Sequence, residues 1–381
     1  MKLLRIISTT DPEAGGVIES VLQASVAMQA LGHEVELLSM DAVDSSWLNS
    51  LPIKTHAVGP GVTSYGYCSR IKGWLTEHHT NYDAFIIDGL WQYHGFAGRD
   101  ALLQMGRKYH VYPHGMLDPW FKRKYPLKHI KKWLYWLAVE YRVIRDAEKV
   151  FFTTEEEKDV SQHSFWLYRC NGEVAPIGTT AFTGDIKSAK QEFFQQYPLL
   201  RDKPYLLFLS RIHPKKGLDL LLKAFAEHHK LQADLHLVIA GPDQTGWRLQ
   251  LEGLAESLGI ENKVIWTGML KDNMKWGAYY NAEAFILPSH QENFGIVVAE
   301  ALACGVPALI SNKVNIWREV EAESAGLVET DTVEGCGRLI KDWINMDNDV
   351  RNSMIVNTKM CFDKHFEISN AAVNLVKALG Y

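Results

Sequence analysis

The fold is decided by residues 284–307, which read AFILPSHQENFGIVVAEALACGVP. The apolar run at its start predicts a buried strand, and Gly295 then opens an apolar helix. The backbone N–H groups of Ile296, Val297 and Val298 are expected to lack carbonyl partners in the first turn of this helix. A strand end followed by a helix N-terminus therefore predicts a binding site for an anion.

Two carboxylates lie eight residues apart across this junction, Glu292 before the helix and Glu300 within it. Ionised carboxylates accept hydrogen bonds, so they can bind hydroxyl groups on either side of an anion such as a diphosphate. The alternative interpretation is a helix cap accompanied by a solvated glutamate.

A second candidate loop follows the apolar residues 205–209 and contains Arg211 and Lys216, with Lys215 beside them. A rigid guanidinium and an ammonium placed after a buried strand can neutralise the negative charge that builds up on a departing phosphate group. A solvated turn is the alternative interpretation of the same residues.

Both stretches resemble motifs of the family 4 glycosyltransferases (glycosyl transferases group 1), which are retaining enzymes with the GT-B fold. The resemblance covers most of the chain. It implies an α/β protein of GT-B architecture, in which two Rossmann-like doubly wound domains face a deep cleft. An acceptor-side domain would span residues 1–183, completed by a C-terminal helix at about 365–381, and a nucleotide-sugar-binding domain would span 184–364.

The resemblance also implies roles for individual positions. Arg211 and Lys216 would grip the diphosphate of the donor, Glu292 would contact hydroxyls of the transferred sugar, and Glu300 would bind the ribose. The expected catalytic residues are His114, Arg211, Lys216 and Glu292. The expected donor-binding residues are Gly15, Gly16, Gly241, Gly268, Met269, Leu270, Asn293, Phe294, Gly295, Ile296, Val297 and Glu300.

Strand and helix signals alternate along the chain, as a doubly wound α/β protein requires. In the first half a helix at 16–31 separates two strands, and in the second half glycines stand at strand ends. The predicted strands are 3–9, 35–39, 84–87, 110–112, 150–152, 205–210, 235–240, 264–267 and 284–287. The last helix is expected at about 369–379.

The loop at residues 10–16 lacks the Gly-x-Gly-x-x-Gly spacing, which argues against a nicotinamide dinucleotide site there. Gly15 and Gly16 would let the backbone approach a substrate closely, although a plain tight turn is a serious alternative. His114 follows the strand at 110–112 and lies at the edge where open α/β sheets bind ligands. The resemblance places it facing the transferred sugar, and a purely structural histidine is the alternative.

Composition is that of a globular protein, with 47% hydrophobic and 22% charged residues. The five cysteines are scattered and form no Cys-x-x-Cys pair, so neither a disulfide framework nor a structural zinc is expected. No Asp-x-Asp motif is identified, which predicts an enzyme that needs no metal and no cofactor. The N-terminal apolar run is too short for a signal peptide and no run approaches a membrane span, so a cytoplasmic protein is expected.

A basic segment with aromatic flanks runs from Trp120 to Trp136, in a chain whose formal net charge is −5. Cations beside tryptophan and tyrosine suit an anionic membrane surface, which predicts peripheral attachment at the cytoplasmic face of the membrane. The alternative is a solvated helix whose aromatics pack inward. No nucleic-acid module is recognised, so no nucleic acid is expected as a partner. The cations are Lys122, Arg123, Lys124, Lys128, Lys131 and Lys132.

The function expected is that of a metal-independent, retaining hexosyltransferase. It would move a hexose from a UDP- or GDP-sugar to a hydroxyl of a glycan or lipid-linked acceptor, in cell-surface polysaccharide or glycolipid biosynthesis. Two alternatives stay open: another GT-B enzyme, such as a sugar-nucleotide epimerase or a phosphorylase, and a non-catalytic subunit that binds sugar nucleotides.

Overall fold

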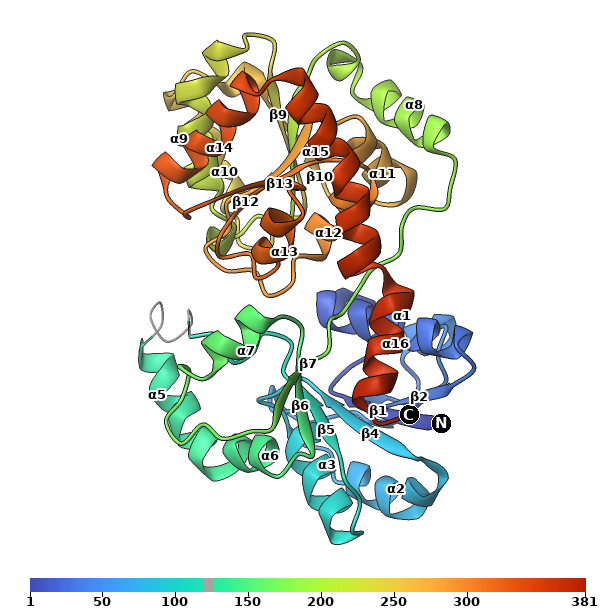
Figure 1. The fold of residues 1–381 in the computed structure, drawn as a ribbon. Coiled ribbons are helices and arrows are strands. Elements are labelled where there is room, and N and C mark those ends of the chain that lie inside the picture. The colour runs from blue at the N-terminus through green and yellow to red at the C-terminus, as the bar shows by residue number, and fades with distance from the viewer. Residues whose placement is uncertain (120–125) are drawn as a thin grey trace. The chain divides into compact units, whose positions relative to one another are not determined.

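The computed structural model describes the backbone of residues 1–119 and 126–381, and the side chains of 1–119, 130 and 132–381. By its internal contacts, the chain divides into two compact units (Figure 1). The first unit comprises residues 1–178 and 368–381, and the second comprises residues 179–367. Both chain termini therefore belong to the first unit.

The described part of the first unit contains a parallel sheet of seven strands, in the order β3-β2-β1-β4-β5-β6-β7. Its order changes direction between β1 and β4, which makes the carboxyl ends of these two strands the usual place for a ligand. The strands are β1 (Lys2–Ile7), β2 (Glu34–Ala42), β3 (Thr55–Gly59), β4 (Ala84–Asp88), β5 (His110–Tyr112), β6 (Lys149–Phe152) and β7 (Gly172–Val174).

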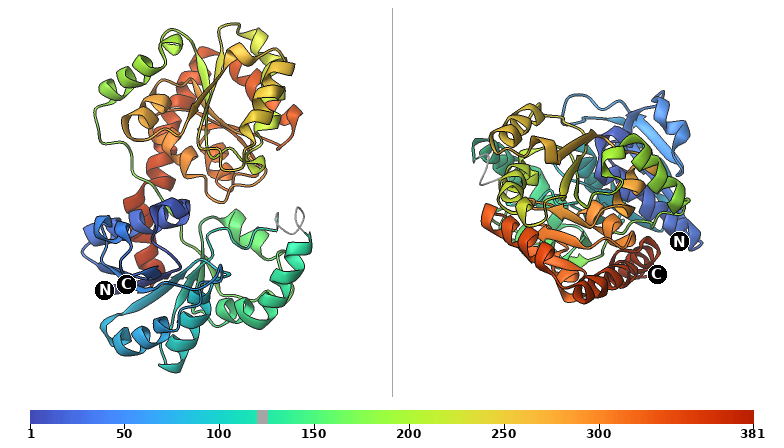
Figure 2. Two further views of the ribbon diagram at one scale, coloured as in Figure 1. Left: turned by 180° about the vertical axis from the view of Figure 1, so that it is seen from behind. Right: turned by 90° about the horizontal axis from the view of Figure 1, so that it is seen from above.

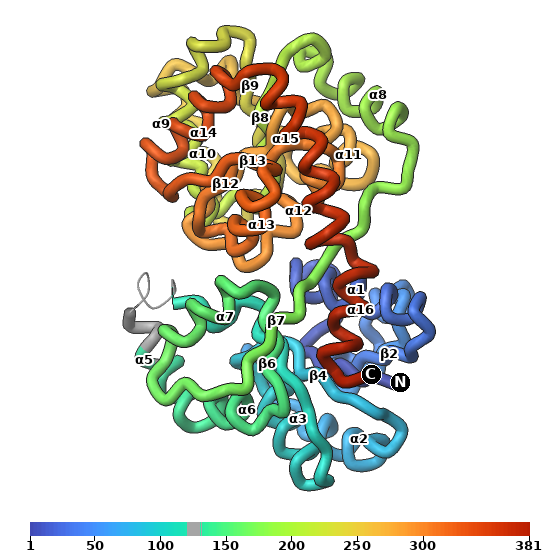
Figure 3. Tube along the Cα trace, in the orientation of Figure 1, coloured from blue at the N-terminus to red at the C-terminus, as the bar shows by residue number. Residues whose placement is uncertain are grey.

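Helices cover both faces of this sheet, which explains why its central strands are almost continuously apolar (Figure 2). The C-terminal helix α16 packs along α1, as the tube trace shows (Figure 3). The helices are α1 (Gly16–Ala30), α2 (Arg70–His78), α3 (Tyr93–Gln104), α5 (Pro126–Tyr135), α6 (Tyr141–Arg145), α7 (Glu155–Ser161) and α16 (Ile368–Ala378), and a π-helical turn at Trp136–Glu140 joins α5 to α6.

The first strand ends two residues before the predicted boundary at Thr9. The Oγ1 atoms of Thr9 and Thr10 donate to the carboxylate of Asp41 at 2.5 and 2.7 Å, and the Thr10 N–H donates to the same carboxylate at 2.7 Å. These bonds turn the chain away from the sheet at the end of β1. Sequence patterns cannot show them because Asp41 lies in the next strand.

The second unit contains a parallel sheet of six strands, in the order β10-β9-β8-β11-β12-β13, and its order changes direction between β8 and β11. The strands are β8 (Tyr205–Leu209), β9 (His236–Ala240), β10 (Val264–Gly268), β11 (Ala284–Leu287), β12 (Ala308–Ser311) and β13 (Gly326–Glu329). The helices are α8 (Ile186–Gln196), α9 (Leu218–His228), α10 (Arg248–Ser257), α11 (Asp272–Tyr280), α12 (Ile296–Ala303), α13 (Trp317–Ala322), α14 (Val333–Asn345) and α15 (Asn348–Cys361).

Candidate active site

The loops that follow β8 and β11 are tied together at the switch point of the second sheet. The carbonyl of Lys215 accepts hydrogen bonds from the N–H of His290 at 2.7 Å and from Ser289 Oγ at 3.0 Å. Gly217 has a φ of +69°, and a Cβ there would lie 2.2 Å from the carbonyl oxygen of Pro288. Only glycine fits this position, so the Lys-Gly part of the sequence motif has a steric reason.

Lys216 and Glu292 form an ion pair across these two loops. Lys216 is 8% exposed, and the Glu292 side chain is 21% exposed. Burial would raise the pKa of Glu292, but the charge and hydrogen bond of Lys216, with smaller effects from Lys215 and Arg211, hold that pKa below its ordinary value. The switch point therefore carries an ionised carboxylate beside an ammonium.

Arg211 follows β8 and is exposed, with Nη1 at 3.4 Å from Gln244 Oε1. Its guanidinium contributes to the lowered pKa of Glu292 through charge, although no hydrogen bond between the two is recorded among the described residues. An exposed guanidinium on this loop can reorient toward a bound anion. The structure thus places Arg211 on the same loop as Lys216, while leaving its side chain in solvent.

The loop that carries Glu292 leads directly into the N-terminus of α12. Gly295 has a φ of +80° and precedes the first helical residue, Ile296. The prediction that the N–H of Val298 lacks a carbonyl partner is wrong, because this group donates to the carbonyl of Gly295 at 2.8 Å. Ile296 and Val297 remain as the first two helical residues, whose N–H groups have no earlier helical carbonyl to bind.

Two neighbours of Gly295 differ in exposure. The Phe294 side chain is buried and packs edge-on against Phe366, with ring centroids 5.7 Å apart. Only the backbone of Phe294 is thus available to bind the sugar-nucleotide donor. Asn293 is half-buried.

Glu300 is buried on α12, and both of its oxygens have partners on α11. Oε1 accepts from Lys275 Nζ at 2.6 Å, and Oε2 accepts from the hydroxyl of Tyr279 at 3.1 Å. These two partners were missed from the sequence. They stand four residues apart on α11, a spacing that puts them on one face of the helix.

Gly241 and Gly268 meet at the same edge of the second sheet, since the N–H of Gly241 donates to the carbonyl of Gly268 at 2.8 Å. Gly241 has a φ of +143°, and a Cβ there would lie 1.9 Å from the carbonyl oxygen of Ser210. After Gly268, Met269 is exposed and Leu270 is half-buried. The structure therefore brings these predicted base-binding residues together beside the loop of Arg211.

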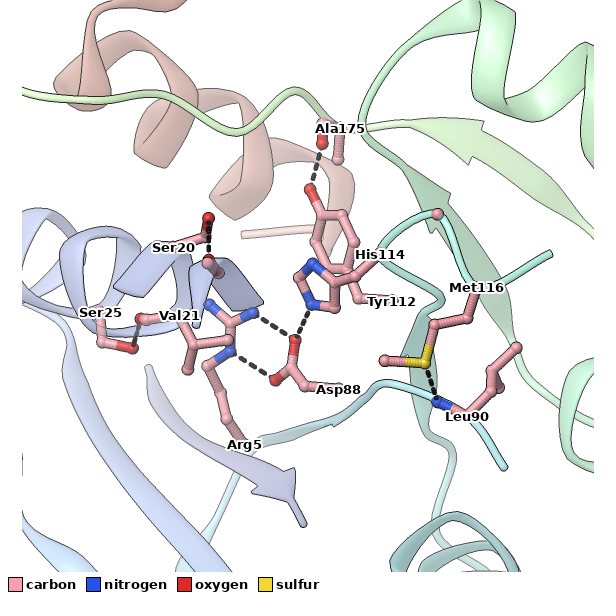
Figure 4. A network of polar contacts seen from close by, with 12 residues as sticks. Arg5, Ser20, Val21, Ser25, Asp88, Leu90, Tyr112, His114, Met116 and Ala175 are labelled. Carbon is pink, nitrogen blue, oxygen red and sulfur yellow. Dashed lines mark hydrogen bonds and ion pairs between the residues drawn. The ribbon is translucent and has the colours of Figure 1, made fainter. Parts of the chain in front are cut away.

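His114 lies in the first unit, directly after β5. Its Nε2 is 2.8 Å from Asp88 Oδ1, and its ring stacks on Tyr112 with centroids 5.0 Å apart (Figure 4). Asp88 in turn receives two hydrogen bonds from Arg5. Neither Arg5 nor Asp88 was predicted from the sequence to be part of a site.

Gly15 and Gly16 stand at the start of α1, in the loop after β1. Gly15 has a φ of +102°, which favours glycine, but a Cβ added at either residue would meet nothing within 4 Å. The backbone conformation thus accounts for Gly15. Among the residues that the structure describes, no contact requires glycine at position 16.

Family profiles match both halves of the chain. The profile "Glycosyl transferases group 1" matches residues 189–360, and the profile "Glycosyl transferase 4-like domain" matches residues 15–162. The chain belongs to the family 4 glycosyltransferases. It is thus a glycosyltransferase with the GT-B fold, and its two parallel sheets are the two Rossmann-like halves of that fold.

Relatives of this glycosyltransferase share its sequence and fold to different extents. It is 25% identical to the mannosylfructose-phosphate synthase of Agrobacterium fabrum, over 81% of this chain and 73% of that protein. Its structure is similar to that of sucrose-phosphate synthase from Thermosynechococcus elongatus, with a TM-score of 0.78, 20% identity and coverage of 99% and 98%. It is also similar to Anabaena Alr3699/HepE in complex with UDP, with a TM-score of 0.77, 17% identity and full coverage of both chains.

The described part of the glycosyltransferase contains no group of three or more His, Cys, Asp and Glu residues that could hold a metal ion. One Asp-x-Asp triplet, Asp347-Asn348-Asp349, was overlooked in the sequence. Asp347 caps α15 by accepting from the N–H of Asp349 at 2.8 Å, so its carboxylate serves the helix start.

The basic segment is described only in part. Lys122, Arg123 and Lys124 lie outside the described residues, as do the side chains of Lys128 and Lys131. The ammonium of Lys132 lies 4.6 Å from the centre of the Trp91 ring, and Trp136 is fully buried. The expectation that Trp136 faces a membrane is therefore wrong, because its ring belongs to the core of the first unit. Within the described residues, no helix is long and apolar enough to cross a bilayer.

Proposed function

We propose that this glycosyltransferase is a metal-independent, retaining hexosyltransferase that uses a UDP- or GDP-sugar. The observation that carries the proposal is the ion pair of Lys216 and Glu292, placed beside the N-terminus of α12 at the switch point of the second sheet. Cation, helix N–H groups and carboxylate thus occupy the edge at which such sheets bind ligands.

The diphosphate of the donor would lie against Lys216, Arg211 and the start of α12. An ammonium has three N–H groups, so Lys216 can keep its bond to Glu292 and still donate to a phosphate oxygen. The exposed Arg211 can add a bidentate contact. These donors would stabilise the charge that develops as the diphosphate leaves, which is the role that a metal ion fills in other transferases.

The nucleoside would lie at the other side of the same edge. Glu300 would accept a hydrogen bond from a ribose hydroxyl, since each of its oxygens has a lone pair beyond the one that Lys275 or Tyr279 uses. The backbone around Gly268 would bind the base. Support for a uridine base comes from the complex of the similar Anabaena protein with UDP, and the same backbone groups could also accept guanine.

The transferred hexose would contact Glu292 from the second unit and His114 from the first. Retention of configuration would follow from front-face attack, in which the acceptor hydroxyl gives its proton to the leaving phosphate. In this scheme Glu292 orients the hexose and stays ionised, consistent with its lowered pKa. The acceptor would bind to the first unit.

The acceptor is proposed to be a glycan or lipid-linked sugar in the synthesis of a surface polysaccharide or glycolipid. Two exposed apolar side chains, Ile130 and Leu134, lie one helical turn apart on α5. Together with the lysines of the basic segment they give α5 the composition of a helix that lies on an anionic membrane. We therefore propose peripheral attachment to the cytoplasmic face of the membrane.

A thermal-shift screen against UDP-, GDP- and ADP-sugars identifies the donor, because a ligand at 100 times its Kd stabilises the folded state by about 2.7 kcal/mol. The donor that binds is then incubated with the enzyme in EDTA, and release of the nucleoside diphosphate is measured. The anomeric configuration of a product formed from an α-linked donor decides retention. A β-linked product, or strict dependence on Mg²⁺, would contradict this part of the proposal.

A further inference from the structure

A buried ion pair joins the two central strands of the first sheet. Arg5 on β1 and Asp88 on β4 are 2% and 1% exposed. Arg5 Nε donates to Asp88 Oδ2 at 2.8 Å, and Nη2 donates to Oδ1 at 2.6 Å (Figure 4). Because Ile7 is the partner of Asp88 in the ladder and Arg5 lies two residues before Ile7, both charged side chains emerge on the same face.

A pair of this kind is weak support for a purely structural role. Apolar residues of similar volume at the same positions are often as stabilising, because two charges must be removed from water. The Nη1 atom of Arg5 is buried and has no hydrogen-bond partner within the described part of the chain. It belongs to a residue that lines a small cavity together with Ser20, Tyr112 and His114.

Asp88 extends the pair to His114. Its Oδ1, which accepts from Arg5, also lies 2.8 Å from His114 Nε2. Burial would raise the pKa of Asp88, but the charge of Arg5 and the hydrogen bonds of His114 and Arg5 lower it to about 2. An ionised carboxylate can only accept hydrogen bonds, so Nε2 of His114 must carry the hydrogen. In the neutral ring, Nδ1 then holds a lone pair, and Figure 4 shows Nδ1 on the side of the ring away from Asp88.

The orientation of the imidazole is fixed from other directions as well. Its ring stacks on Tyr112 at an interplanar angle of 18°, and the hydroxyl of Tyr112 donates to the carbonyl of Ala175. His114 has a φ of +51°, which is uncommon for a residue with a side chain. The next residue, Gly115, donates its N–H to Glu157 Oε1 at 2.6 Å. The loop is therefore held on both sides of the ring.

The other ionisable groups around Asp88 leave this arrangement undisturbed. His94 on α3 approaches the backbone carbonyl of Asp88, with Nε2 at 2.9 Å. Burial lowers the pKa of His94 to about 4, so near pH 7 this ring is neutral and donates to the carbonyl. Tyr112 on β5 presents its ring to the guanidinium of Arg5 at 6.0 Å. Arg5 is thus the cation that faces the Asp88 carboxylate.

We propose that Arg5 and Asp88 are positioning residues for sugar transfer: they hold His114 with hydrogen on Nε2, so that Nδ1 accepts a hydrogen bond from a hydroxyl of the bound sugar. Arg5 keeps Asp88 in place, and Asp88 sets which nitrogen of His114 is the acceptor. This inference rests on the proposed contact between His114 and the sugar. The tautomer itself does not depend on that contact and can be measured without a substrate.

The first test is ¹⁵N NMR of the intact protein labelled on histidine. The His114 signals are assigned by their loss in a His114→Asn variant. In the neutral ring we expect the shifts of a protonated Nε2 and an unprotonated Nδ1, and the donor sugar should move the Nδ1 signal. An Nδ1–H tautomer, or averaging of the two tautomers, would overturn the inference. If the Nε2–H tautomer is fixed but the Nδ1 signal does not shift when the donor sugar binds, the proposed contact between His114 and the sugar would be wrong.

The second test compares kcat and donor affinity in variants. Arg5→Met/Asp88→Val replaces the buried pair by apolar side chains, which protects folding, and removes the partner of His114 Nε2. We expect kcat to fall roughly 10- to 150-fold, the range for a lost charged hydrogen bond, with a smaller increase in the donor Kd and with the His114 tautomers mixed. Wild-type kcat, or an unchanged His114 spectrum, would contradict the proposal. If this variant does not fold, the wild-type spectrum decides.

A matched control is Glu36→Gln, which changes another buried acid of the same sheet. Glu36 on β2 pairs with Lys2 and Lys54 and accepts from the hydroxyl of Tyr82 at 2.6 Å. Its loss should lower the melting temperature while leaving kcat and the His114 spectrum as in wild type. A decrease in kcat equal to that of the double variant would show that any damage to the sheet slows the reaction, which would refute a specific role for Arg5 and Asp88.

Discussion

Replacing Lys216 by methionine tests the role of the ion pair at the switch point. Methionine keeps most of the aliphatic volume of Lys216, which is 8% exposed, and removes only the ammonium. The proposed contact with the leaving diphosphate is a charged hydrogen bond, worth roughly 1.5–3 kcal/mol. At about 1.4 kcal/mol for each factor of ten, kcat should fall by roughly 10- to 150-fold. The donor KM should change less, because the charge on the diphosphate increases in the transition state.

The same substitution has a separate effect on stability, because Glu292 keeps its partly buried carboxylate and loses its cation. Its side chain is 21% exposed, so the cost should be about 1–3 kcal/mol and below that of a fully buried unpaired charge. The lowered pKa of Glu292 stabilises the wild-type protein above the ordinary carboxyl range, and this contribution is lost as the pH falls from that range through the lowered pKa of the folded state. The difference in Tm between wild type and Lys216→Met should therefore shrink on acidification below about pH 4.5.

Steady-state kinetics with a saturating donor and thermal unfolding measured in parallel separate these effects. Adding Glu292→Gln to Lys216→Met should restore Tm without restoring kcat. Lys203→Met is the matched control: Lys203 pairs with Asp234 at 2.6 Å on the surface of the same unit and should leave kcat unchanged. Wild-type kcat in Lys216→Met, or recovery of kcat in the double variant, would refute the assignment of Lys216 to the diphosphate.

Three further predictions concern Glu300, Glu140 and the need for a metal ion. Glu300→Ala should raise the donor KM about tenfold with a smaller effect on kcat, because ribose contacts are similar in the ground and transition states; a selective loss of kcat would show that Glu300 acts on the sugar. Glu140, fully buried, has its pKa raised by burial to about 8, so folding keeps it protonated and wild-type stability should fall as the pH rises from about 5 to 8. Glu140→Gln should flatten that fall in Tm; parallel curves would mean that Glu140 is ionised. Turnover should persist in EDTA, and its complete loss, reversed by Mg²⁺ or Mn²⁺, would contradict a metal-independent reaction.

The order of elements could be predicted from the sequence because each is a local pattern. The strands predicted at 84–87 and 284–287 are short apolar runs that the structure confirms as β4 and β11, and Gly295 precedes α12 as expected. Local patterns also led to residues such as Lys216 and Glu292, since each lies in a recognisable loop. That these two bind each other required the order of strands, which places β8 beside β11.

The site residues that were missed are those whose roles depend on distant partners. Arg5 interrupts an apolar strand and Asp88 ends another, and a charge in a buried strand needs a partner. The sequence therefore signalled that each was paired, but 83 positions separate them and only the sheet brings them together. For Lys275 the sequence gave a weaker indication of a buried partner, because a lysine on a helix is usually solvated. Its bond to Glu300 follows from the packing of α11 beside α12.

The proposed reaction at the Lys216–Glu292 site is transfer of sugar from a nucleoside-diphosphate donor. The most direct measurement is release of nucleoside diphosphate from the donor chosen by the thermal-shift screen, in EDTA, by wild type and by Glu292→Gln. The isosteric variant keeps the shape of the site and removes the charge that is proposed to orient the hexose. Release by wild type and a reduction of at least about tenfold in the variant are predicted. Equal release by both proteins, or no release by wild type from any UDP-, GDP- or ADP-sugar with or without acceptor, would contradict sugar transfer at this site.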